Sequence, residues 1–125
     1  MRALLLAPIL LLSVAATNDR DAANVEKTLA GKAPGEPREC LSAFQSQRMS
    51  VHDGLLLFRV NSKLVYRNDL NNCPSLREDD IIQTNLFGSG QLCRGDIFQI
   101  IDRTGGFNRG ACTFGKFVPY QAAAR

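Results

Sequence analysis

The sequence predicts a mainly β fold: a small antiparallel barrel or sandwich of about five to six strands, held by two disulfides. From residue 48 onward, apolar and polar residues alternate in short runs, which is typical of strands with one buried face. Turn-forming glycines and asparagines separate these runs. Four cysteines follow an apolar leader, and cysteines pair in an oxidising compartment. Short strands joined by tight turns favour an antiparallel sheet that closes on itself or folds into two layers.

The first sixteen residues have the pattern of a signal peptide. Met1 and Arg2 give a positive start, residues 3–12 are almost wholly apolar, and small residues follow up to Ala16. The apolar run is about half as long as the ~20 residues that a membrane-spanning helix needs. We therefore expect a leader at 1–16 that is cleaved, and no stable membrane insertion of the mature protein.

Residues 17–39 predict a flexible N-terminal arm. This stretch has five acids and four bases, and its large apolar residues are limited to Val25 and Leu29. Such a segment buries too little apolar surface to offset the entropy lost on ordering it. We expect at most a frayed helix across residues 20–30.

Residues 40–120 predict one disulfide-bonded β domain, followed by a C-terminal tail at 121–125. All seven phenylalanines lie in this domain, which is small enough for cross-links to be a common supplement to its core. From residue 40 onward there are ten bases and seven acids, dispersed along the chain. A nucleic-acid partner would need a clustered basic face, so none is expected.

The clearest local prediction is a hairpin formed by strands at 54–60 and 64–68. Alternation places Phe58 on one face of the first strand and Arg59 on the other. The other expected elements are a helical turn at 41–47, strands at 81–87, 91–102 and 112–118, and a glycine-rich loop at 104–110.

The four cysteines allow three pairings, and the sequence does not choose among them. We prefer Cys40–Cys112, which would staple the start of the domain to its last strand, and Cys73–Cys93, which would tie a loop to the long strand. In the chain-entropy view each bond contributes roughly 3 to 4.5 kcal/mol. Zinc and redox sites usually place cysteines in Cys-x-x-Cys pairs, whereas the nearest two here are twenty residues apart.

No catalytic constellation is evident. His52 is the only histidine, so a Ser–His or Cys–His mechanism would have to use it, but its setting is typical of a partly exposed turn residue. The acidic run 78–80 lacks the alternating pattern of a calcium loop and predicts a solvated loop. We therefore expect no catalytic residue, metal or cofactor.

Four residues are candidates for binding. Arg59 and Arg67 should lie side by side on the hairpin face opposite Phe58, an unfavourable arrangement unless an acid or a ligand sits between them. Asp69 or Asp96 could supply that acid. An anionic ligand, or a carboxylate from a partner, is the functional alternative.

The cysteines and the segments around them also resemble those of a known protein family. The segments 65–70, 73–76, 91–93, 96–97 and 112–117, in this order, are similar to a family of small exported bacterial proteins catalogued as domain of unknown function 6491. The resemblance covers residues 40–119. Ser75 and the dipeptide at 113–114 depart from the glycine and the glycine–leucine pair that are frequent in the family. The resemblance implies export and paired cysteines, and it transfers no activity.

Together these features predict a non-enzymatic module in the periplasm or outside the cell. It would act by binding, as an inhibitor or an interaction domain, and its partner would be an envelope or extracellular protein or an anionic ligand. The alternative is a small hydrolase that uses carboxylates near the hairpin at 54–69. A third hypothesis, thiol redox chemistry, requires at least one free cysteine.

Overall fold

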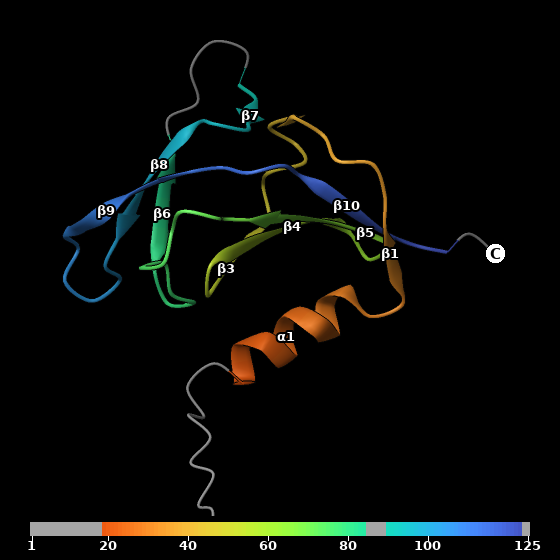
Figure 1. Cartoon of the computed structure of the whole chain (residues 1–125), viewed down its shortest axis with the longest axis horizontal. Coiled ribbons are helices and arrows are strands. Elements are labelled where there is room, and N and C mark those ends of the chain that lie inside the picture. Colours follow the sequence, from red (N-terminus) through yellow and green to blue (C-terminus); the bar gives the residue numbers. More distant parts are fainter. Residues whose placement is uncertain (1–18, 85–89, 124–125) are drawn as a thin grey trace, which may run out of the picture.

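The computed structural model describes residues 19–84 and 90–123, so the signal peptide expected at 1–16 lies outside the described residues. The described chain is mainly β, and every pairing between its strands is antiparallel, which confirms the predicted fold class (Figure 1). Its elements are α1 (Asp19–Leu29), β1 (Lys32–Pro34), β2 (Cys40–Leu41), β3 (Met49–His52), β4 (Leu55–Asn61), β5 (Leu64–Asp69), β6 (Ile81–Thr84), β7 (Leu92–Cys93), β8 (Ile97–Ile101), β9 (Asn108–Thr113) and β10 (Val118–Ala122).

The strands form a five-stranded sheet in the order β1-β10-β5-β4-β3, a three-stranded sheet in the order β6-β8-β9, and the pair β2-β7. The described strands outnumber the five to six expected, because predicted runs are interrupted and because β1 and β2 form where no strand was expected. The strand expected at 91–102 breaks at Gly95, whose φ of 88° glycine adopts readily, and becomes β7 and β8. The expected last strand at 112–118 is divided between the end of β9 and the start of β10.

The predicted hairpin is confirmed as β4 and β5. Phe58 lies opposite Tyr66, and Leu57 lies opposite Arg67. The side chain of Asn61 stabilises the turn by accepting a hydrogen bond from the backbone N–H of Lys63 at 2.8 Å. Both faces of the hairpin carry buried apolar side chains, with Phe58 on one face and Leu57 on the other, and this decides where the rest of the chain packs.

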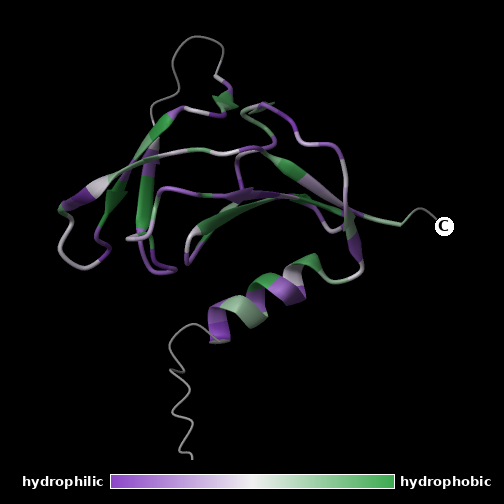
Figure 2. Ribbon diagram, in the orientation of Figure 1, coloured by the Kyte–Doolittle hydropathy of each residue, from purple (hydrophilic) through white to green (hydrophobic). Residues whose placement is uncertain are grey.

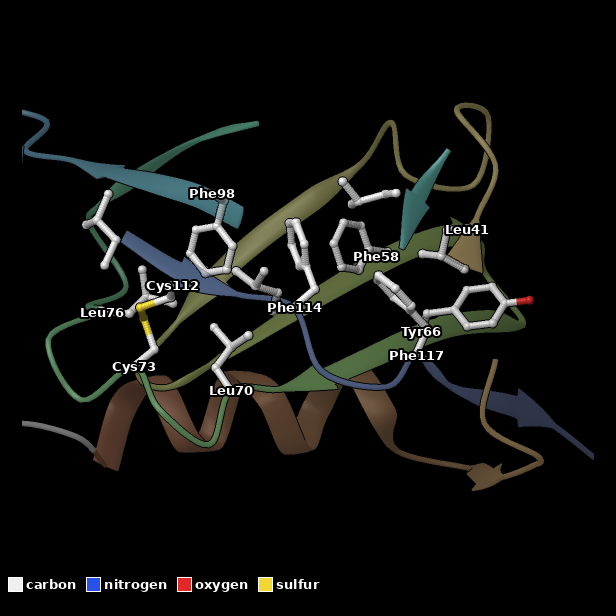
Figure 3. Close-up of a cluster of buried hydrophobic side chains, with 13 residues drawn as sticks. Leu41, Phe58, Tyr66, Leu70, Cys73, Leu76, Phe98, Cys112, Phe114 and Phe117 are labelled. Atoms are coloured by element: carbon white, nitrogen blue, oxygen red, sulfur yellow. A yellow bond between two sulfur atoms is a disulfide. The ribbon is translucent and has the colours of Figure 1, made fainter. Parts of the chain in front are cut away.

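One face of the hairpin packs against the second sheet. A chain of aromatic rings crosses the core, with centroid separations of 5.7 Å for Phe58–Phe117, 6.0 Å for Phe117–Phe114 and 4.7 Å for Phe114–Phe98 (Figure 3). These distances suit edge-to-face and tilted ring packing. The two larger sheets are thus the layers of a small sandwich with one shared core.

The other face of the hairpin is covered by the segment expected to be a flexible arm. The helix expected across 20–30 is present, but it is packed against the sheet instead of frayed. Helix α1 lies across this face (Figures 1 and 2). Its Val25 is buried against Leu57 and Val65. Strand β1 then pairs with β10 at the sheet edge, with Lys32 opposite Ala122. The arm has few apolar residues of its own, but the outer face of the hairpin supplies the apolar surface that its composition lacks.

The preferred disulfide pairing is also wrong, because the bonds are Cys40–Cys93 and Cys73–Cys112. Cys93 lies on the short strand β7, directly opposite Cys40 on β2. The expected contact between the start of the domain and its C-terminal part does form, but it is a backbone bridge between Arg38 and Phe117, five residues beyond Cys112. None of the four cysteines is free, whereas the thiol redox hypothesis requires at least one.

Two disulfides are typical of proteins that fold in oxidising compartments outside the cytosol. Among the helices of the described residues, none has the length and apolar character needed to cross a membrane.

Candidate functional site

A cleft of about 410 Å³ lies between helix α1 and the strands β3 and β4. We call it the arginine cleft. Its lining residues are Thr28, Arg48, Ser50, His52, Leu57 and Arg59.

The register of β3 against β4 brings these side chains to one face. Ser50 lies opposite Leu57, and the backbone N–H of Arg59 donates to the carbonyl oxygen of Arg48 at 2.9 Å. Because side chains alternate along a strand, Arg48, Ser50 and His52 project from the same face. That is the outer face of the sheet, the one that α1 partly covers.

A continuous hydrogen-bonded chain runs from the helix to the cleft. Asp21 Oδ1 lies 2.7 Å from His52 Nδ1, and His52 Nε2 lies 2.8 Å from Ser50 Oγ. Asp21 Oδ2 accepts a second hydrogen bond, from the backbone N–H of Asp53 at 2.8 Å. A carboxylate only accepts, so the proton of a neutral imidazole belongs on Nδ1, and Nε2 is left to accept from the serine hydroxyl.

The three residues of this hydrogen-bonded chain differ in how deeply they are buried. Asp21 is 4 % exposed, His52 is 8 % exposed, and Ser50 is exposed at the surface of the cleft. The expectation of a partly exposed turn histidine is therefore wrong, since His52 ends strand β3 and is buried under α1. Sequence reasoning missed its partner because Asp21 lies 31 residues earlier, in the segment taken for a flexible arm.

The two arginines of the cleft are not paired with an acid in residues 19–84 and 90–123. Neither Arg48 nor Arg59 forms an ion pair with any residue in the part of the chain that the structure describes. Both side chains are exposed, and both also line a second depression beside Phe44, an aromatic residue that is 69 % exposed. The cleft is therefore cationic, with an aromatic surface next to it.

Of the four predicted binding residues, the structure places only Arg59 in the cleft. Arg67 lies opposite Leu57 rather than beside Arg59, and its guanidinium pairs with Asp69 at 3.1 Å, which is the internal ion pair considered from the sequence. Asp96 is far along the chain from the hairpin and accepts a hydrogen bond from the backbone N–H of Cys93. Arg48 was missed, although its position follows once β3 is paired with β4.

The acidic run at 78–80, expected to be a solvated loop, is solvated only in part, because Glu78 and Asp79 are exposed but Asp80 is not. Asp80 is buried, pairs with Arg109 and accepts a hydrogen bond from the backbone N–H of Arg77, so it holds loops together. Over residues 19–84 and 90–123, no group of three histidine, cysteine or acidic residues is placed to bind a metal ion.

Fold and site together define a small disulfide-bonded β sandwich with one docked helix and a cationic cleft beside it. No family model, curated protein or solved structure matches the chain. Its function is therefore argued from the residues of the cleft and their geometry.

Proposed function

We propose that this protein is an exported binding module that takes a carboxylate of an envelope or extracellular protein into the arginine cleft. The observation that supports the proposal most directly is the pair Arg48 and Arg59, joined by a backbone hydrogen bond and without an ion-pair partner among the residues that the structure describes. Like charges in this position disfavour the sheet, and a bound anion would remove that cost.

The chemistry of the pair suits a carboxylate. An arginine guanidinium presents its N–H donors in a planar fork that matches the two oxygens of a carboxylate. Phe44 borders the same two arginines and offers an aromatic surface to an apolar neighbour of that carboxylate. A ligand segment with an acidic residue beside an apolar one fits this combination.

A short acidic peptide tests the proposal. Isothermal titration would compare an acetylated glutamate–phenylalanine–glutamate tripeptide with its glutamine–phenylalanine–glutamine analogue. We expect the acidic peptide alone to bind, and Arg48→Gln or Arg59→Gln to weaken it roughly fivefold each, the effect of losing about 1 kcal/mol from an exposed ion pair. Binding should also weaken as salt is added.

Arg94→Gln is the matched control, because Arg94 is an exposed arginine that lies outside the cleft and faces Glu39 at 3.7 Å. The proposal fails if the acidic peptide does not bind, or if the cleft variants and the control bind it equally well.

We also infer that the protein is periplasmic or secreted and belongs to the exported family that its cysteine-containing segments resemble. The two disulfides support this location. Cell fractionation should recover the protein outside the cytosol without residues 1–16, and recovery of the intact chain from the cytosol would contradict the inference.

The alternative function, a hydrolase that uses carboxylates near the hairpin, has less support. Asp69, the carboxylate on which that hypothesis centres, is paired with Arg67. Hydrolysis is better supported by Asp21, His52 and Ser50 than by Asp69.

A further inference from the structure

We propose that Asp21, His52 and Ser50 form a nucleophilic centre, in which Ser50 accepts an acyl group from an ester bound in the arginine cleft. The inference rests on the proposed function, because the same two arginines would hold the anionic part of the substrate.

The distances satisfy the geometric requirement for an activated serine. The hydroxyl is 2.8 Å from a base, and the base is 2.7 Å from the carboxylate that orients it. Both separations lie within the hydrogen-bond range expected of a nucleophile, a general base and an orienting group. The order of burial also fits, since the orienting acid and the base are shielded while the nucleophile faces the cleft.

A purely structural role explains only part of this arrangement. The bonds from Asp21 to His52 and to the backbone of Asp53 are sufficient to fasten α1 to the sheet. They do not require an exposed hydroxyl on Nε2, or two arginines in the same cleft that form no ion pair with any described residue. All three features meet at Ser50.

The acylation step uses groups that the cleft already contains. Ser50 Oγ bonds to the carbonyl carbon of the ester as its proton passes to His52 Nε2. The carbonyl oxygen becomes an oxyanion, and one of the two arginines that line the cleft, Arg48 and Arg59, can stabilise that charge while the other holds the anionic part of the substrate. The carbon–oxygen bond to the leaving alcohol then breaks, and the alcohol takes the proton from Nε2.

Water completes the cycle. It attacks the acyl carbon as Nε2 takes one of its protons, the bond to Ser50 Oγ breaks, and the serine recovers that proton. One ester and one water therefore give one acid and one alcohol. Asp21 acts as a positioning residue, because it keeps the proton on Nδ1 and leaves Nε2 free to accept.

The arginines also define the substrate class. An ester that carries a second carboxylate can place this group against one guanidinium while its carbonyl lies near Ser50. A neutral ester of the same length lacks that anchor. We therefore expect esters of dicarboxylic acids to be preferred over esters of simple fatty acids.

The test uses the full disulfide-bonded protein with two aryl esters of equal chain length, mono(4-nitrophenyl) succinate and 4-nitrophenyl butyrate. Release of nitrophenolate gives the rate, and peptide mass mapping locates the acyl group. We expect an acyl group on Ser50, faster reaction with the succinate ester, and loss of this preference in Arg59→Gln. Removing the nucleophile in Ser50→Ala should abolish the adduct and lower the rate by roughly 10²-fold or more.

Control variants separate the chemistry from folding. Ser62→Ala removes another exposed serine near the same arginines and should react like the wild type. Ser50→Cys should still be acylated. Asp21→Asn should lower kcat with little change in KM, because the imidazole loses the carboxylate that orients it while the arginines that hold the substrate remain. If the contact between Asp21 and His52 only held the cleft together, KM would rise as kcat falls.

The two proposals can fail separately. If the acidic peptide binds in an Arg59-dependent way but Ser50 is never acylated, the nucleophilic centre is refuted and the binding function stands. Acylation of a lysine in place of Ser50 refutes the centre as well. If Ser50 is acylated but the peptide does not bind and the succinate ester has no advantage, the anion-binding function is refuted.

Discussion

Asp21 fastens helix α1 to the sheet, and Asp21→Asn should loosen that attachment. Its two carboxylate oxygens accept hydrogen bonds from His52 Nδ1 and from the backbone N–H of Asp53. Asparagine has one acceptor oxygen, so one of these donors must lose its partner. A hydrogen bond to a charged group contributes about 1.5–3 kcal/mol, so the undocked population of α1 should rise roughly 10- to 150-fold.

Limited proteolysis measures this population. Helix α1 has 11 residues, which is too few to persist as an isolated helix in water, so an undocked helix unfolds. Trypsin should then cleave after Lys27 while the disulfide-bonded sheets remain folded. When docking is faster than cleavage, the cleavage rate rises in proportion to the undocked population.

The control for this experiment is Glu26→Gln on the same helix. Glu26 is exposed and forms no ion pair within residues 19–84 and 90–123, so the variant makes the same charge change without breaking a buried bond. If trypsin cleaves Asp21→Asn no faster than Glu26→Gln, the two buried bonds do not hold the helix. The contact of Val25 with Leu57 would then be its main attachment.

Two further substitutions test the sandwich itself. Cys73→Ala combined with Cys112→Ala opens a loop of 39 residues and should lower the free energy of unfolding by about 4 kcal/mol; an unchanged denaturant midpoint would contradict this. Gly115→Ala should cost about 1–3 kcal/mol in the same assay, because a Cβ there would lie 2.5 Å from the backbone carbonyl oxygen of Asp69. Gly35→Ala, whose Cβ would meet a proline side chain at 3.3 Å, should cost less, and equal losses would refute the packing argument.

The sequence predicts those parts of the fold that depend on neighbouring residues. The β4–β5 hairpin follows from alternation and from a turn at residues 61–63, all within 15 residues. The interruption at Gly95 was missed because the apolar pattern of residues 91–102 continues across it. Local pattern therefore finds strands but does not always show where they end.

The docked helix and the disulfide pairing depend on contacts between distant segments. Val25 is buried by residues of the hairpin, which its own segment does not reveal. Cys40 and Cys93 meet only because β2 pairs with β7 across a separation of 53 residues. Neither contact leaves a signal in the periodicity or composition of one segment.

The residues of the candidate site also differ in whether local sequence is enough to predict them. Arg59 was predicted because its face follows from strand alternation. Arg48 depends on the register between β3 and β4, and the bond between His52 and Asp21 depends on where α1 docks. The residues that make the cleft chemically distinctive are thus the ones brought together by tertiary contacts.

A comparison of the arginines on this sheet face supports a binding role for the arginine cleft. On β5, Arg67 is neutralised by Asp69, a residue two positions along the same strand. This shows that an acid two positions away is enough to neutralise an arginine on this sheet. Within the described ranges 19–84 and 90–123, Arg48 and Arg59 form no such ion pair, and both lie beside an exposed Phe44. A sequence selected only for stability would be expected to place an acid there too, and departures of this kind are concentrated at functional sites.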